Sequence, residues 1–142
     1  MSIQAALKYE LANGTNVSAI TTRVYPAGDI PQRAARPYVT YIVIADMPVG
    51  HQGGRSGLTA TSFQIDAWSD TEKAAAELQM AVRDDLVPSG VPFRGNMGDP
   101  GDPVVVRLAK ESPADEDWFP PDDGSDRPLF RGTSHFEIWN TG

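Results

Sequence analysis

The chain has 142 residues, a length that fits one domain with a real hydrophobic core. Hydrophobic residues make up 40% and charged residues 22%, a balance that excludes wholesale disorder. The formal net charge of -7 argues against tight binding to a phosphate backbone, which needs clustered Lys and Arg. With no cysteine, the chain has no disulfides and no thiolate chemistry. It shows neither a signal-peptide pattern nor an apolar run near the roughly 20 residues of a membrane span.

The first elements are a helix and a short extended piece. Residues 2–13 predict an amphipathic helix with Ser2 as N-cap, and its apolar stripe is Ile3, Ala6, Leu7 and Leu11. Gly14 suits the position after its end, and a short helical turn is expected around 17–20. Residues 23–26, Arg-Val-Tyr-Pro, predict a short extended piece that proline ends, and 27–36 predict a loop.

Two strands joined by a glycine-rich connection come next. Residues 38–45 are β-branched and aromatic on both faces, which predicts a central strand. Residues 58–68 predict a second strand, with Phe63, Ile65 and Ala67 on one face and Gln64 and Asp66 on the other. Residues 48–57 between them predict a long glycine-rich hairpin connection. It is not a phosphate-binding loop, because Arg55 stands five positions after Gly50 where that motif needs glycine, and a strand follows instead of a helix.

A second helix and two more strands complete the predicted fold. Ser69 and Glu72 have the spacing of a capping box, and the apolar face that follows is Ala75, Leu78, Val82 and Leu86. Pro88 and Gly90 end this helix, and 96–103 predict turns. Residues 104–110 and 129–140 predict strands. We therefore expect one α/β (α+β) domain over 1–142, with an approximately four-stranded, mostly antiparallel sheet and two main helices packed on one face.

The connection at 111–127 is acidic and is predicted to be a loop. It holds seven acidic residues and Arg127, so its net charge is 1 − 7 = −6, close to the excess of the whole chain. Its Asp122–Asp126 stretch lacks the ligand spacing of an EF-hand, which favours a solvated tip over a calcium site. Trp118 and Phe119 in this loop either fold back on the subunit or anchor a neighbouring chain.

No catalytic or metal-binding constellation is visible. His51 and His135 are the two histidines, and neither has a second ligand at metal-binding spacing. Asp66 lies among apolar residues, so we expect a partner for it, either Arg23 or Arg83, in a structural role. The sequence thus predicts no enzyme, no cofactor and no metal. Candidate contact residues lie in the predicted loops and on the last strand: His51, Gln52, Arg55, Trp118, Phe119, Arg131, His135 and Trp139.

In order and spacing, these pieces resemble the tail terminator or tail completion family of long-tailed phages. The matching stretches are the first helix, 23–26, 36–41, the 51–57 loop running into 61–68 and its helix, and 130–131 leading to 136–139. The resemblance covers nearly the whole chain, although no single motif is specific. The long acidic loop and His135, where an acidic residue is more usual, depart from the family pattern.

The resemblance implies a structural virion protein of the tail, assembled in the host cytoplasm. Such subunits form a homo-oligomeric ring, typically a hexamer, at the head-proximal end of the tail. The ring caps the tail tube protein and offers a surface to the head–tail connector or neck. Genomic DNA would only pass through the lumen, and no membrane is involved. Two alternatives stay open: a neck or head-closure connector, and a small ligand-binding or hydrolase domain.

Overall fold

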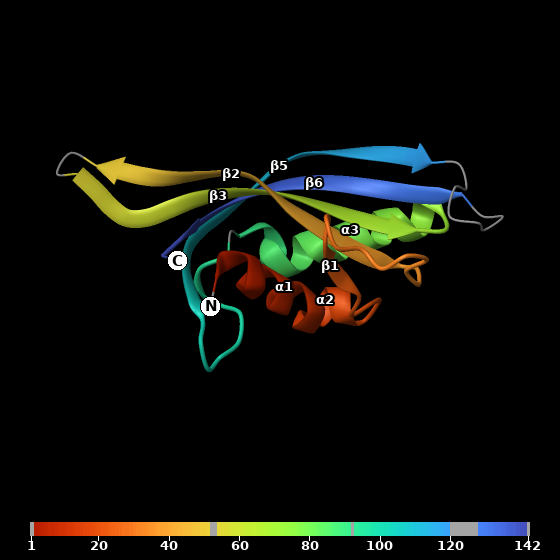
Figure 1. The fold of residues 1–142 in the computed structure, drawn as a ribbon, viewed down its shortest axis with the longest axis horizontal. Helices are drawn as coiled ribbons and strands as arrows, with labels where there is room; N and C mark the ends of the chain where they lie inside the picture. Colours follow the sequence, from red (N-terminus) through yellow and green to blue (C-terminus); the bar gives the residue numbers. More distant parts are fainter. Residues whose placement is uncertain (1, 52–53, 92, 120–127, 142) are drawn as a thin grey trace.

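One six-stranded sheet with helices on one face organises the chain (Figure 1). The computed structural model describes residues 2–51, 54–91, 93–119 and 128–141, and of these it describes 49–51, 54–57, 89 and 107–119 by their backbone alone. The elements, in chain order, are α1 (Ile3–Asn13), α2 (Thr15–Ser18), β1 (Val24–Pro26), β2 (Tyr38–His51), β3 (Gly54–Ser69), α3 (Glu72–Leu86), η1 (Pro88–Gly90), β4 (Gly95–Met97), β5 (Val104–Phe119) and β6 (Leu129–Asn140).

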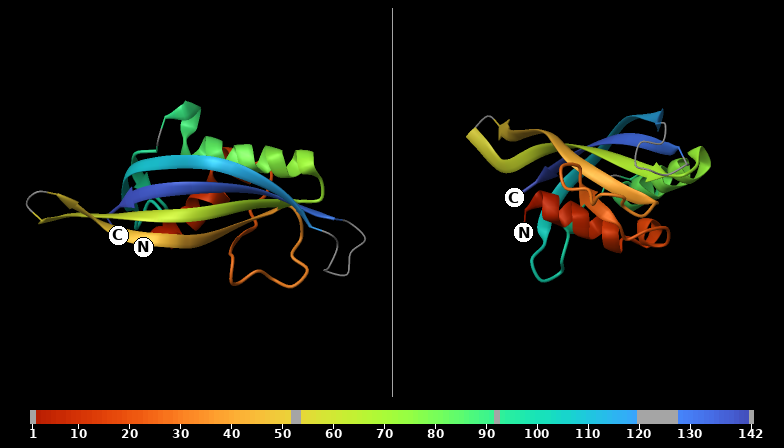
Figure 2. Two further views of the ribbon diagram at one scale, coloured as in Figure 1. Left: turned by 90° about the horizontal axis from the view of Figure 1, so that it is seen from above. Right: turned by 45° about the vertical axis from the view of Figure 1, so that its right-hand side comes forward.

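Two long hairpins lie side by side in the centre of the sheet. The strand order is β1-β2-β3-β6-β5-β4, so the β2–β3 hairpin meets the β5–β6 hairpin along β3 and β6. The pair β1–β2 is parallel and every other neighbouring pair is antiparallel. The two hairpins extend towards opposite ends of the molecule, as both Figure 1 and the left view of Figure 2 show. The predicted mostly antiparallel α/β class is confirmed, with six strands in place of four.

The two main helices bury the stripes that the sequence predicts. The hydroxyl of Ser2 caps α1 by accepting the Ala5 N–H at 3.1 Å, and Ile3, Ala6, Leu7 and Leu11 are all buried. On α3 the buried face is Ala75, Leu78, Ala81, Val82 and Leu86. Thr71 caps this helix by accepting the Ala74 N–H at 3.1 Å. The predicted cap at Ser69 is wrong, because Ser69 is still paired with Phe130 at the end of β3.

The core lies between these helices and one face of the sheet. Phe63 and Phe136 stand opposite each other on β3 and β6 and are 0% and 1% exposed. Val39, Ile65 and Ile138 extend the same buried layer, and α3 packs across β3 and β6. Each hydrophobic group buried here contributes roughly 25 cal/mol per Å² of apolar surface removed from water. Because successive side chains of a strand point to opposite faces, the residues that alternate with this buried layer lie on the face of the sheet away from the helices.

Three strands are longer than the sequence predicts. Residues 46–51 and 54–57 extend the first hairpin, where we expected a long irregular connection. Residues 111–119 belong to β5, where we expected an acidic loop, while 120–127 lie outside the described residues. In both places the partner strand completes the backbone hydrogen bonding, which overrides the poor strand propensity of Gly, Asp and Glu. The short strand β4 falls where only turns were predicted.

Glu10 on α1 is held in an environment that disfavours its charge. Burial raises the pKa of its carboxyl, the N–H of Gly98 at 3.5 Å lowers it, and the nearby Asp85 carboxylate raises it again. Asp85 itself is held by the N–H groups of Asn16 and Val17, at 3.1 and 2.9 Å, at the start of α2. The balance leaves the pKa of Glu10 above its ordinary value. Ionised Glu10 therefore costs stability at neutral pH.

We expect Glu10→Gln to raise the free energy of unfolding at neutral pH by less than about 1 kcal/mol. A carboxyl whose folded pKa is raised destabilises the fold above that pKa, and this cost disappears below the ordinary glutamate value of about 4.3. The gain of the variant should therefore vanish on acidification. Urea unfolding at a series of pH values measures it, with the exposed Glu77→Gln as control. A gain that persists in acid would contradict this account.

Candidate interaction surface

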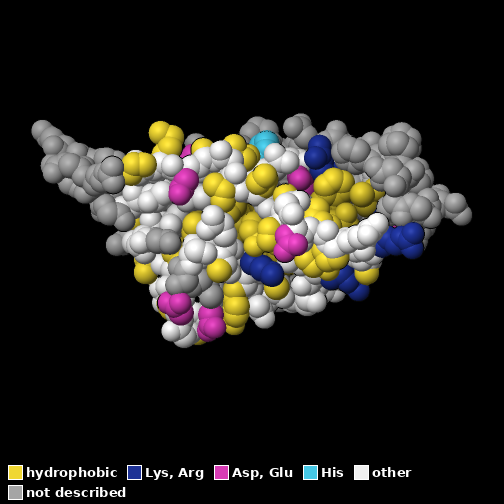
Figure 3. Space-filling view, viewed as in Figure 1, with side chains coloured by type: hydrophobic (Ala, Val, Ile, Leu, Met, Phe, Trp, Pro, Cys, Tyr) yellow, Lys and Arg dark blue, Asp and Glu magenta, His cyan; other side chains and the backbone are white. Residues whose placement is uncertain are grey.

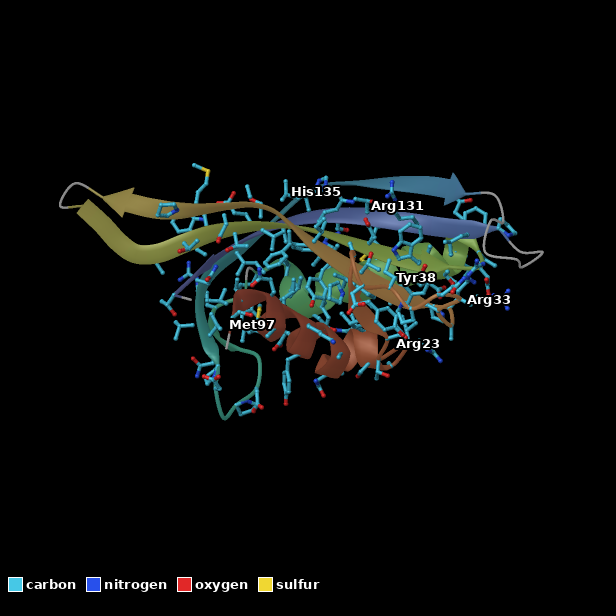
Figure 4. The ribbon with its side chains drawn as sticks, in the orientation of Figure 1. Arg23, Arg33, Tyr38, Met97, Arg131 and His135 are labelled. Atoms are coloured by element: carbon cyan, nitrogen blue, oxygen red, sulfur yellow. The ribbon has the colours of Figure 1, made fainter. Side chains whose placement is uncertain are left out.

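One face of the sheet is turned away from the helices and is the candidate interaction surface, called here the open face. Phe63, Ile65 and Ala67 on β3 face the helices, so Gln64 and Trp68 between and beyond them point away. On β6, Phe136 and Ile138 are buried, and the alternating Arg131, His135, Glu137 and Trp139 lie on the open face. Figure 4 shows Arg131 and His135 along β6, whereas Met97 lies beside α1 on the helix side.

A row of aromatic rings and one arginine crosses one end of the open face. The rings of Tyr38 and Trp68 stack with centroids 6.0 Å apart and planes 18° apart, and Tyr25 leans on Tyr38 at 6.1 Å. The guanidinium of Arg131 lies 5.6 Å from the centre of the Trp68 ring, a cation–π contact. The indole N–H of Trp68 also donates to the Thr40 hydroxyl at 2.9 Å. The row is thus rigid, and a partner would meet it with little loss of side-chain entropy.

Arg36 fastens the loop before β2 to the end of this row. Its side chain is 7% exposed and its Nη1 lies 2.9 Å from Asp70 Oδ1, just after β3. The same nitrogen donates to the carbonyl of Pro128 at 3.1 Å, just before β6. One guanidinium therefore joins three segments that are far apart in sequence. Around it, Arg23 and Arg33 are exposed, so this end of the molecule presents positive charge beside apolar surface (Figure 3).

Polar residues follow in the next row of the open face. Thr40, Asp66 and Thr133 stand in register on β2, β3 and β6 and are 1%, 6% and 5% exposed. The Asp66 carboxylate accepts from Gln64 Nε2 at 3.2 and 3.3 Å. The prediction of Arg23 or Arg83 as its partner is wrong: Arg23 Nη1 lies 3.5 Å from the Pro37 carbonyl, and Arg83 is on α3, on the helix side of the sheet. A neutral amide on the same strand takes that place. The expected partial burial of Asp66 is confirmed.

Apolar side chains occupy the opposite end of the open face, on β2. Ile42, Ile44 and Met47 are 48%, 55% and 64% exposed, and we call these three residues the β2 strip. Met47 stands in register with Ala60 on β3, and Ala60 with Trp139 on β6. The indole N–H of Trp139 donates to the Glu137 carboxylate at 2.5 Å, and the Trp139 side chain is half-buried. We expected this strand to be central and covered on both faces, but only its first residues are flanked by β1.

The outer edge of β2 is closed to a further strand. Val39 donates its N–H to Arg23, and Tyr41 accepts from Ala27, so these alternate residues direct their backbone groups outward to the β1 side. One extra residue enters the strand at Ile44, where the register shifts between Val43 and Ala45. Counting on from this bulge, Pro48 occupies an outward position and offers no N–H there. A bulge and a proline both prevent strand addition at an edge.

The structure separates the eight predicted contact residues. Arg131, His135 and Trp139 share the open face, and His135 stands in register with Gln64. His51, Arg55, Trp118 and Phe119 lie in the ends of β2, β3 and β5 and not in loops, with side chains outside the described residues; Gln52 lies outside them altogether. Sequence reasoning missed Tyr25, Tyr38, Trp68 and the β2 strip. The alternation of apolar residues shows which side chains of one strand share a face. The register between strands is needed to show which side chains of different strands are neighbours on that face.

The described residues hold no group of three or more His, Cys, Asp or Glu side chains that could bind a metal ion. Among the helices that the structure describes, none has the length and apolar character needed to span a membrane. What the geometry offers is stacked rings, a buried polar row and exposed aliphatic side chains on one sheet face. Such a face suits contact with another protein.

The fold and this face define a small two-layer α/β subunit with one sheet face turned away from the helices. The sequence model of the family "Tail completion protein gp17" matches residues 3–140, so the chain belongs to that family of phage tail structural proteins. Its fold is also that of a chain in the structure titled "Virion of native gene transfer agent (GTA) particle". The TM-score is 0.66 at 21% sequence identity, over 99% of this chain and 96% of that one. A comparison with curated proteins gave no match.

Proposed function

We propose that the protein is a tail terminator: copies close into a ring, a hexamer, on the head-proximal end of the tail tube. The ring stops tube growth and gives the head–tail connector or neck a surface to bind. Genomic DNA passes through its lumen, where the overall negative charge of -7 limits sticking. The role is structural and not enzymatic. Membership of the tail completion family over 3–140 is the observation that carries this proposal.

The geometry supports a mechanism based on shape. A subunit with an open sheet face and exposed aliphatic side chains near its edge favours association, because a contact removes that apolar surface from water. Contacts between two different surfaces of identical copies generate a ring when the rotation closes. A closed ring on the last tube layer leaves no position for the next one. The partners are then a second copy, the tube protein and the neck protein.

Particles made without this protein should have tails of uncontrolled length. The experiment is to disrupt the gene, purify the tails and measure their lengths by electron microscopy, with the intact gene supplied in trans as control. Overlong tubes are expected, because nothing would cap the growing end. Tails of normal length beside filled, unattached heads would instead assign the protein to the neck or head closure. Adding the purified protein to the overlong tubes should place a ring at one end.

A further inference from the structure

The junction between α1 and α2 holds an asparagine followed by a glycine, Asn13 and Gly14. The chain has four asparagines, and none of the others precedes a glycine. We propose that Asn13 is a site of spontaneous deamidation and that the product weakens the cap of α2. The reaction needs no enzyme, and the inference does not depend on the proposed ring.

Deamidation is an attack by a backbone nitrogen on the side chain that precedes it. The nitrogen of Gly14 bonds to Cγ of Asn13 and loses its proton to solvent, while the Cγ–Nδ2 bond breaks and ammonia leaves. Water then opens the resulting succinimide ring at either carbonyl, which gives aspartate or isoaspartate, and no atom is oxidised or reduced. Glycine on the attacking side favours the reaction, because it has no side chain in the way and its backbone reaches conformations that other residues avoid.

Asn13 lies where this attack can occur. It is the last residue of α1 and is exposed, and Gly14 already has an extended backbone, with φ -64° and ψ 144°. The side-chain Nδ2 donates to the Tyr9 carbonyl at 2.9 Å, so this bond and the last turn of the helix must open first. Because helix ends fray, that opening is local and does not require the whole domain to unfold.

Asn16 has the opposite surroundings and is an internal control. Its Nδ2 donates to Asp85 Oδ1 at 2.9 Å, which holds the side-chain amide in place. The nitrogen that would attack it belongs to Val17, whose N–H donates to Asp85 Oδ2 at 2.9 Å. Val17 is also buried and β-branched, so its side chain restricts the approach. We therefore expect Asn16 to keep its amide while Asn13 reacts.

The packing around position 14 requires a glycine there. A Cβ atom on this residue would overlap the Asp85 carboxylate and lie 2.7 Å from the Glu10 carbonyl oxygen, closer than real Cβ contacts. Asp85 cannot move away without releasing the N–H groups of Asn16 and Val17, which it holds at 3.1 and 2.9 Å. The close approach that caps α2 therefore also places the reactive Asn-Gly bond beside that cap.

Both products should disturb this junction. Each has a new carboxylate at the C-terminal end of α1, where the helix dipole disfavours negative charge, next to the residue against which the Asp85 carboxylate packs. Each also loses the hydrogen bond from Asn13 Nδ2 to Tyr9. Isoaspartate in addition inserts a methylene group into the backbone between the helices, which shifts Gly14 relative to Asp85. The cap on Asn16 and Val17 should therefore weaken.

Peptide mapping by mass spectrometry, after incubation of the folded protein in mildly alkaline buffer, tests the site. We expect the amide of Asn13 to become an acid faster than the amides of Asn16, Asn96 and Asn140. Lost amides are counted and not isoaspartate, because the Asp-Gly pair at 123–124 can form isoaspartate without losing an amide. An Asn13 amide that survives until urea-unfolded protein has fully reacted, or an equally fast change at another asparagine, would overturn the assignment.

The variant Asn13→Gln tests the coupling to α2, because its longer side chain forms the corresponding ring far more slowly. Wild-type protein converted at Asn13 should have a lower Tm than fresh protein and faster hydrogen exchange at the amides of Asn16 and Val17. The variant incubated in the same way should show neither change. Full conversion of Asn13 that leaves both quantities unchanged, or equal changes in the variant, would overturn the coupling.

Discussion

Replacing Phe63 by alanine is expected to lower the free energy of unfolding by about 3–5 kcal/mol, the typical cost for a buried phenylalanine. The side chain is 0% exposed and faces Phe136 across the two central strands, where both hairpins and α3 meet. The surrounding backbone is held on both sides by neighbouring strands, so the cavity cannot collapse easily. Natural domains have a free energy of unfolding of about 5–15 kcal/mol, so this one substitution would remove a large part of it.

Thermal and urea unfolding followed by circular dichroism would measure the loss. At this chain length, each kcal/mol corresponds to roughly 2–4 °C in Tm, so a fall of about 6–20 °C is expected. Phe63→Leu keeps most of the volume and should cost less than half as much. The exposed Met80→Ala should change stability by at most about 0.5 kcal/mol. Equal effects from the Phe63 and Met80 variants would show that the core is not centred where the structure places it.

Arg36→Ala is expected to have the second largest effect, a loss of about 2–3 kcal/mol. The Arg36 side chain is 7% exposed and the Asp70 side chain is 28% exposed. Removing the cation leaves the Asp70 carboxylate and the Pro128 carbonyl without this donor in a partly buried site. The partial exposure of Asp70 keeps the figure below that of a fully buried pair. The loop before β2 and the start of β6 should loosen together.

Lys73→Ala is the matched control for this prediction. Lys73 and Glu77 form a 4.0 Å pair on α3, with side chains 88% and 62% exposed, and such surface pairs contribute little. Denaturant unfolding compares the two variants, and hydrogen exchange at Thr40 and Arg131 reports whether the aromatic row is disturbed. A cost for Arg36→Ala no greater than that for Lys73→Ala would contradict the anchoring role described for Arg36.

Local patterns in the sequence predict most of the fold. The stripes of α1 and α3 and the alternation of Phe63, Ile65 and Ala67 appear in the structure as expected, because helical and strand periods of apolar residues directly report a buried face. The prediction of connections at 54–57 and 111–119 was wrong, because the glycines and acidic residues there have poor strand propensity. Those segments are strands because a long partner lies alongside, a pairing between distant residues that local propensity does not contain.

The candidate surface was only partly predictable for the same reason. Arg131, His135 and Trp139 alternate on one strand, so their common face could be predicted, while the Tyr38–Trp68–Arg131 row requires the register of three strands. Asp66 shows a further limit. Its burial was foreseen from its apolar neighbours, but its hydrogen-bond partner is Gln64 on the same strand and not one of the expected arginines. The β2 strip was missed because 38–45 was predicted to be a central strand covered on both faces.

The bulge at Ile44 and the proline at position 48 have a consequence for the life of the free subunit. An extended strand with a bare, apolar edge is the usual starting point for runaway stacking into fibres. Because β2 cannot offer an uninterrupted line of donors and acceptors, free subunits are protected from such stacking. The bulge and the proline would let a subunit with exposed apolar residues remain at high concentration without forming fibres.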